Sequence, residues 1–247
     1  MHLSVIVPAY NEADRIEPTL ERITAHLGRQ PHWWPAEVVV VDDGSADRTA
    51  RVVAAVPASD TVAVRCLSHP RNRGKGAAVR TGFAHAAGDW LLLCDADLAT
   101  PIEELERLRE AVGPGIAIGS RAVDRSRIER RQPWYRDLMG RTFNLAVQAL
   151  AVPGIGDTQC GFKLFPGDLG RRLAAVQRLD GFAFDVELLA LCRAWGVPIR
   201  EVPVRWRHVE ASRVRPVAHS ADMLADLLRI ACWRLGGGLP AARGSGR

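Results

Sequence analysis

The stretch that decides the fold is "LLLCDADLAT", residues 91–100, where an apolar run changes to acidic residues within a single step. The apolar half is typical of the end of a buried strand. Asp95 and Asp97 follow directly, with the small Ala96 between them. Two carboxylates are costly at the edge of an apolar core unless something compensates their charge. Their position therefore suggests that the two carboxylates bind a ligand.

Apolar strands alternate with helical patterns through the first 120 residues. Near-continuous apolar runs predict strands at 3–8, 37–45, 62–67, 89–95 and 115–120. Apolar residues at helical spacing predict helices between them at 13–27, 47–55, 74–86 and 101–112. Strands of this kind, separated by helices, form a mostly parallel central sheet with helices on both faces. The sequence therefore predicts a Rossmann-like α/β fold.

The second half of the chain is less regular. Its patterns predict strands at 158–165 and 199–206 and helices at 134–151, 184–195 and 220–235. We see no internal repeat and no clean linker, so residues 1–235 are expected to form a single domain. The glycine-rich segment 236–247 is expected to be a flexible tail.

Polar residues gather where four of the predicted strands end. In open α/β sheets, ligands bind beyond the carboxyl ends of the strands. The segments at these ends are Tyr10–Glu12, Asp42–Gly44, Asp95–Asp97 and Gly119–Arg121. We therefore expect all four segments to surround one crevice.

Asp95 and Asp97 can share one divalent cation and hold it against a diphosphate. Hard oxygen ligands of this kind suit Mg²⁺ or Mn²⁺. The alternative is structural, because Asp97 or Thr100 can also cap the helix expected from Pro101. When the two aspartates are considered alone, the metal-binding and the structural interpretations have about equal support.

Three other polar residues fit a nucleotide site. The Asp43 carboxylate can accept a hydrogen bond from a base N–H, and Glu12 can hold a ribose hydroxyl. Lys75 lies between two glycines at a predicted helix start and can approach the nucleotide, although the P-loop pattern GxxxxGK[ST] is absent. Each residue also has a structural interpretation, as part of a turn or as a charge at a helix start.

Composition excludes several classes of protein. The chain has 247 residues, 47% apolar and 25% charged, as is ordinary for a soluble globular protein. The five cysteines include no CxxC pair and predict reduced thiols. The N-terminus does not resemble a secretory signal, and no run approaches the roughly 18 apolar residues of a membrane span. We expect a cytoplasmic protein, which includes one bound peripherally to the cytoplasmic face of a membrane.

The net charge of +5 is unevenly placed. Seven arginines lie between residues 121 and 141, close to the Trp134–Tyr135 pair and an apolar helix. This combination predicts an element that docks on a membrane surface. Arginines on a solvated surface next to a helix buried in the core would give a similar sequence pattern. Nucleic acid is not an expected partner, because the basic residues do not alternate with aromatic residues on a strand.

Motifs along residues 3–235 resemble the family 2 glycosyltransferases of the GT-A fold. The most similar subgroup is that of the dolichyl- or polyprenyl-phosphate β-glucosyltransferases, which are related to the dolichyl-phosphate mannose synthases. The motifs, in family order, are "SVIVPAYNEADRI", "VVVVDDGSADRT", "NRGKGAAVRTGF", "DADLATP", "GSR", "DTQCGFKLF", "FAFDVELL" and "VPVRWRHVEASRV". The resemblance makes 1–120 the nucleotide-sugar half and 121–235 the acceptor half.

The resemblance implies a role for each matching residue. The base and ribose would be lined by Pro8, Tyr10, Glu12, Val41 and Asp43. The diphosphate and the metal would be bound by Asp95, Ala96 and Asp97, with Arg121 as a further donor-site residue. Arg207 and Arg213 would form a basic pair for the donor pyrophosphate and the acceptor phosphate. Two positions depart from the mannose synthases: Ala99 replaces a glutamine metal ligand, which favours the glucosyl subgroup, and Arg213 replaces a lysine.

The implied reaction is an inverting transfer of a hexose, with UDP-glucose as the expected donor and a polyprenyl phosphate as the acceptor. Asp185 and Glu187 are the candidate acids near the acceptor, which we expect to orient the sugar rather than act as an indispensable base. Three alternatives remain open: a GDP-mannose-dependent mannosyltransferase, a soluble family 2 enzyme with a non-lipid acceptor, and a non-catalytic nucleotide-sugar-binding protein.

Overall fold

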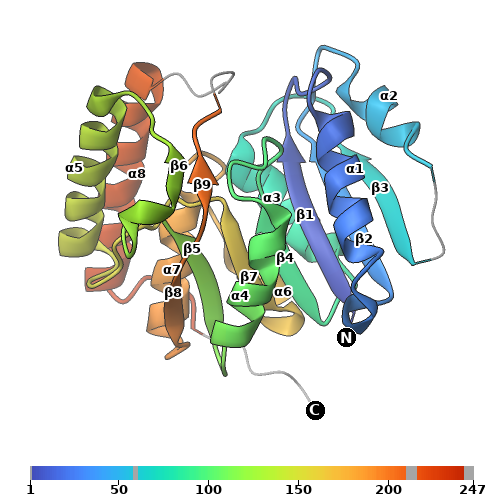
Figure 1. Cartoon of the computed structure of the whole chain (residues 1–247). Coiled ribbons are helices and arrows are strands. Elements are labelled where there is room, and N and C mark those ends of the chain that lie inside the picture. The colour runs from blue at the N-terminus through green and yellow to red at the C-terminus, as the bar shows by residue number, and fades with distance from the viewer. Residues whose placement is uncertain (1, 58–60, 210–215, 242–247) are drawn as a thin grey trace.

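A seven-stranded sheet forms the centre of the computed structural model, which describes residues 2–57, 61–209 and 216–241 (Figure 1). The order across the sheet is β3-β2-β1-β4-β7-β5-β8. All neighbouring strands are parallel except β7, which runs antiparallel to both β4 and β5. The strands are β1 (Leu3–Ala9), β2 (Ala36–Asp42), β3 (Val62–Ser68), β4 (Trp90–Cys94), β5 (Ile116–Ser120), β7 (Phe162–Pro166) and β8 (Ile199–Pro203).

Helices cover both faces of this sheet, as the alternating pattern predicts. Val5 and Val7 of β1 face a core shared with α1 and α4, whereas Ile6 faces a core shared with α3, α6 and α7. Helices α5 and α8 pack against the second core and against each other. The helices are α1 (Ile16–Leu27), α2 (Thr49–Ala54), α3 (Lys75–His85), α4 (Leu105–Ala111), α5 (Trp134–Leu150), α6 (Gly167–Val176), α7 (Phe184–Ala194) and α8 (Pro216–Leu235). The fold class and most of the expected elements are confirmed.

Helix α6 is absent from the sequence prediction. Its sequence contains two glycines, which lower helix propensity. Close packing demands one of them, because a Cβ on Gly167 would lie 2.1 Å from the backbone carbonyl oxygen of Gly88. Tertiary packing therefore overrides local preference here.

The expected strand at 199–206 is two strands. The ladder with β5 ends at Pro203, which has no N–H to continue it. The chain then forms β9 (Trp206–Arg207), which pairs with β6 (Ile128–Arg130) in a separate two-stranded sheet. This small sheet lies above the carboxyl ends of the central strands (Figure 1).

The expected flexible tail is partly docked. The indole Nε1 of Trp195 donates to the carbonyl of Pro240 at 2.7 Å, and Leu239 packs against the core. The first residues of the expected tail thus contact the domain, and residues 242–247 lie outside the described part of the chain. The flexibility of the tail stays a prediction.

Two further expectations can be compared with the structure. All five cysteines are free thiols, as predicted. Within the described residues, none of the helices combines the length and apolarity needed to cross a bilayer.

Candidate active site

The two aspartates of the opening motif lie on a tight turn after β4. Asp95 donates its backbone N–H to the carbonyl of Gly161, and the N–H of Ala99 donates to Asp97 Oδ1 at 3.0 Å. Gly161 immediately precedes β7, and a Cβ there would lie 2.0 Å from Asp95 Oδ2. The close approach of β7 to this carboxylate therefore requires glycine at position 161.

Negative charge is concentrated at this turn. Burial and the nearby charge of Asp95 raise the pKa of Asp97 above its usual range, although Arg15, Lys75 and the N–H of Ala99 oppose the shift. The Lys75 ammonium forms an ion pair with Asp95 Oδ1 at 2.7 Å. A cation is thus already bound to one of the two carboxylates.

A buried charge pair lies beneath the turn. Lys163 on β7 is fully buried, and its ammonium donates to Asp185 Oδ1 and to the carbonyl of Cys160, both at 2.6 Å. Burial raises the pKa of Asp185, although the ammonium groups of Lys163 and Lys75 partly offset this effect. Burial acts to lower the pKa of Lys75, but Asp95 and Asp185 outweigh it, and the pKa lies above its usual range.

A cavity of about 330 Å³ brings these groups together. Lys75, Asp95, Asp97 and Asp185 line it from the sheet side, and Arg121 also reaches it. Helices α5 and α8 add a more apolar part of the lining, with Met139, Phe143 and Met223, together with Arg136. Charged groups and apolar surface therefore meet in one cavity at the carboxyl edge of the sheet.

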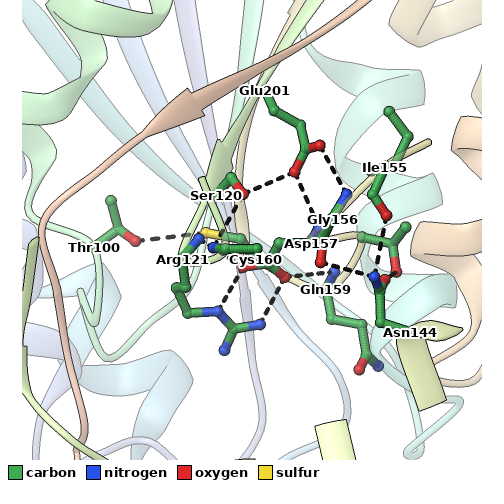
Figure 2. A network of polar contacts seen from close by, with 12 residues as sticks. Thr100, Ser120, Arg121, Asn144, Ile155, Gly156, Asp157, Gln159, Cys160 and Glu201 are labelled. Carbon is green, nitrogen blue, oxygen red and sulfur yellow. Dashed lines mark hydrogen bonds and ion pairs between the residues drawn. The ribbon is translucent and has the colours of Figure 1, made fainter. Parts of the chain in front are cut away.

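Arg121 is held rigidly at the end of β5 (Figure 2). Its guanidinium donates to both carboxylate oxygens of Asp157, at 2.6 and 2.8 Å, and stacks 5.3 Å from the centre of the Trp206 ring. The backbone N–H of Arg121 also donates to Asp157 at 2.9 Å. Bidentate pairing of this kind fixes both the position and the plane of the guanidinium.

Glu201 on β8 holds the loop that carries Asp157 (Figure 2). Its carboxylate accepts the N–H groups of Gly156 and Asp157, at 2.7 and 3.0 Å, and the hydroxyl of Ser120 at 2.8 Å. Burial would raise the pKa of Asp157, but the Arg121 guanidinium outweighs it, and the pKa lies below its usual range. Neither Asp157 nor Glu201 was predicted from the sequence as a site residue.

Asp43 is buried and has several partners within the protein. It accepts hydrogen bonds from His69 Nδ1 at 2.6 Å and from the N–H groups of Arg73 and Gly74, at 3.0 and 2.7 Å. The carboxylate thereby fixes the loop that leads into Lys75. Its contact with a base remains a prediction, and its structural role is evident.

The other residues expected at the base and ribose differ in exposure. Tyr10 is 40% exposed at the end of β1, whereas Pro8 lies within that strand and is buried. Glu12 is buried, and its carboxylate pairs with Arg15. Val41 is fully buried and packs with Val39 and Ala78, so its side chain belongs to the core and does not face the crevice.

The remaining candidates occupy distinct positions. Ala96 is buried at the aspartate turn. Arg207 is exposed on β9, and its N–H donates to the carbonyl of Ala99 at 2.9 Å, which brings β9 to that turn. Arg213 lies outside the described residues. Glu187 accepts the N–H groups of residues 178 and 179 at 2.8 Å, so it holds a loop, and a role near the acceptor stays a prediction.

The aspartate turn fits a divalent cation shared with a substrate. Within the described ranges, no three His, Cys, Asp or Glu side chains cluster as a complete protein-made metal site. Asp95 and Asp97 nevertheless supply two hard oxygen ligands, and the Lys75 ammonium shows that a cation is stable at Asp95. Mg²⁺ is usually held by one or two carboxylates together with phosphates and water. The donor set therefore fits a metal that binds with a diphosphate.

Structural comparison identifies the fold of the protein. The chain is similar to glucosyl-3-phosphoglycerate synthase from Mycobacterium tuberculosis, which was solved with Mn²⁺, UDP and glucosyl-3-phosphoglycerate. The TM-score is 0.67, and the identity is 22% over 95% of this chain and 80% of that one. Mannosyl-3-phosphoglycerate synthase from Rubrobacter xylanophilus gives a TM-score of 0.65 and 21% identity over 100% and 78% of the two chains. The fold is that of the GT-A glycosyltransferases.

Sequence comparison then identifies the family. The profile of Glycosyl transferase family 2 matches residues 4–166. The chain is 36% identical to the dolichyl-phosphate beta-glucosyltransferase of Dictyostelium discoideum over 93% of its length and 74% of the relative. It is 37% identical to the enzyme of the same name from Homo sapiens over 94% of its length and 78% of the relative. The chain belongs to glycosyl transferase family 2.

We expect Asp157→Asn to destabilise the protein by about 3 kcal/mol at pH 7, because it leaves the Arg121 cation without its buried anion. The pKa of Asp157 is lower in the folded state than in the unfolded state. Its contribution is therefore present above the unfolded value of about 3.9 and is lost as pH falls through the folded value. Urea unfolding should show the difference between the two proteins shrinking below about pH 4.

The control for this measurement is Asp168→Asn, which removes a highly exposed partner of Arg171. This variant should unfold like the unsubstituted protein, because exposed ion pairs contribute little. Equal stability of the Asp157 variant and the unsubstituted protein at pH 7 would show that Asp157 does not hold Arg121.

Proposed function

We propose that this chain transfers glucose from UDP-glucose to a polyprenyl phosphate, as a dolichyl-phosphate β-glucosyltransferase. The observation that carries this proposal is the mixed lining of the cavity, which combines paired carboxylates, arginines and apolar side chains. Such a cavity suits both a nucleotide diphosphate and a lipid-linked phosphate. The 36–37% identity to enzymes of that name over more than nine-tenths of the chain supports the same assignment.

The donor diphosphate would bind beside the aspartate turn. Asp95 and Asp97 would hold a divalent cation, Mg²⁺ or Mn²⁺, which supplies charge neutralisation for the departing UDP. Lys75 is placed to add a further positive charge at the same diphosphate. Arg121, held by Asp157, presents a fixed guanidinium to the cavity.

The acceptor phosphate would enter between Arg121 and Arg136. Both line the cavity, and the Nε of Arg136 is buried without a hydrogen-bond partner in the described structure. One phosphate oxygen attacks the anomeric carbon from the face opposite the departing UDP, so the product is β-linked. A phosphate monoester is already anionic at neutral pH, and the reaction does not require a strong general base.

Asp185 is suited to orient the sugar. Its carboxylate lies at the cavity and is anchored from below by Lys163. An ionised carboxylate fixed in this way accepts hydrogen bonds from sugar hydroxyls, and its ion pair opposes its use as a free base. We therefore assign Asp185 to positioning of the donor sugar rather than to proton transfer.

Helices α5 and α8 provide a surface suited to the cytoplasmic face of a membrane. They lie side by side (Figure 1) and expose apolar side chains to solvent, including Trp134 at 77% and Leu145 at 67% on α5. Leu224 and Leu228 are exposed on α8. Exposed arginines near the start of α5 add attraction for anionic lipids, of about 1 kcal/mol per residue near the surface.

Transfer of labelled glucose tests the proposed reaction. With UDP-glucose, Mn²⁺ and a polyprenyl phosphate in detergent, we expect the label to move into the organic phase, because the product carries the lipid. Asp97→Asn should reduce this transfer by at least about 100-fold, since it removes one ligand of the metal that stabilises the leaving group. GDP-mannose should be a poor donor in the same assay. Label that passes only to water-soluble acceptors, or transfer from GDP-mannose alone, would contradict the proposal.

Co-sedimentation with anionic vesicles tests the proposed membrane surface. We expect the protein to pellet with vesicles at low salt and less at high salt, and the double substitution Leu138→Glu with Leu145→Glu to abolish pelleting. The control is Ala54→Glu with Ala55→Glu, which adds the same two charges at two exposed positions at the end of α2. Equal pelleting of the two double variants would place the membrane contact elsewhere.

A further inference from the structure

The Lys75 ammonium occupies the place of a metal ion at the aspartate turn. Its Nζ lies 2.7 Å from Asp95 Oδ1, one of the carboxylate oxygens expected to bind the divalent cation. The side chain is partly exposed and lines the cavity. A lysine and a metal ion on one carboxylate repel each other, so the two cations compete for Asp95.

The backbone on both sides of Lys75 is closely packed. Gly74 has a φ of +109°, and a Cβ there would lie 2.3 Å from the carbonyl oxygen of Asp180. A Cβ on Gly76 would lie 2.5 Å from the carbonyl oxygen of Leu179. The start of α3 therefore packs closely against residues 179–181, and the N–H of Ala77 donates to the carbonyl of Asp180 at 3.2 Å. The long side chain of Lys75 has several rotatable bonds through which its ammonium can move.

A second anion is available to the displaced ammonium. Asp185 lines the same cavity and acts electrostatically on Lys75, as Asp95 does. The Asp185 carboxylate is held in place by the buried Lys163. The charged groups therefore alternate in sign from the core to the surface, in the order Lys163, Asp185, Lys75 and Asp95.

We infer that Lys75 is an exchangeable counter-cation that couples metal binding to nucleotide binding, an inference that rests on the proposed function for its metal and its diphosphate. Without metal, the ammonium neutralises Asp95. When a divalent cation and a nucleoside diphosphate bind together, the ammonium moves off Asp95 toward the diphosphate and Asp185. A metal ion that binds without a diphosphate must displace the Lys75 ammonium from Asp95. When the diphosphate binds as well, it gives this ammonium a new anionic partner.

This exchange makes the two ligands cooperative. UDP strengthens the binding of the metal, and by linkage the metal strengthens the binding of UDP by the same factor. Lys75 thereby disfavours occupation of the aspartate turn by metal in the absence of donor. The effect belongs to binding and is separate from any role of Lys75 in turnover.

Titration with Mn²⁺ tests this inference, with free Mn²⁺ measured by electron paramagnetic resonance in the presence and absence of UDP. We expect Lys75→Met to bind Mn²⁺ alone about tenfold more tightly than the unsubstituted protein, which corresponds to about 1.4 kcal/mol. The same variant should bind UDP more weakly, and the strengthening of Mn²⁺ binding by UDP should shrink. Lys75→Gln, which is also neutral, should behave in the same way if the methionine variant folds poorly.

The matched control is Arg136→Met, which removes one positive charge from the same cavity without removing a partner of Asp95. It should change Mn²⁺ affinity much less than Lys75→Met. Unchanged or weaker Mn²⁺ binding by both Lys75 variants would overturn the inference, as would an equal effect of Arg136→Met or an absence of Mn²⁺ binding in every protein. The titration involves no sugar transfer, so a wrong donor sugar or acceptor would leave its result intact.

Discussion

The structure depends on one electrostatic constraint, which is the crowding of carboxylates where β4 ends. Asp95 and Asp97 lie on a tight turn with one residue between them, and all three carboxylates, including that of Asp185, line one cavity. Burial raises the pKa values of Asp97 and Asp185, so their ionised forms need positive charge nearby. Lys163 supplies it from the core and Lys75 from the surface. The cavity thus contains carboxylates whose negative charge suits a cationic ligand.

The antiparallel strand β7 makes this arrangement possible. Because β7 runs against β4 and β5, its first residues lie at the edge where those strands end. The segment before β7 therefore carries Asp157 and Gly161 to the site, and β7 itself carries Lys163 beneath it. An all-parallel sheet would place these residues at the opposite edge. The insertion of one reversed strand thus joins the second half of the chain to the first.

Local patterns in the sequence were sufficient for the central strands, for the covering helices other than α6 and for the strand ends around the crevice. Apolar periodicity specifies strands and helices, and parallel topology brings their carboxyl ends together. The pairing of Asp157 with Arg121 and the support from Glu201 were missed, because these contacts span 36 and at least 44 positions and leave no local signal. Lys163 offered a signal, since a lysine inside the apolar run "GFKLF" requires a buried partner. The core position of the Val41 side chain was not foreseen, because a family motif does not report which face of a strand a side chain occupies, and a contact of Val41 with the base stays a prediction.

The central claim is that Asp95 and Asp97 bind a divalent cation together with the donor diphosphate. Calorimetric titration of UDP, with and without Mn²⁺, into the protein and into the double variant Asp95→Asn with Asp97→Asn tests it most directly. The account predicts that Mn²⁺ strengthens UDP binding to the unsubstituted protein by at least about tenfold, equivalent to about 1.4 kcal/mol, and has no effect on the variant. A folded double variant that retains the full effect of Mn²⁺ would contradict the account.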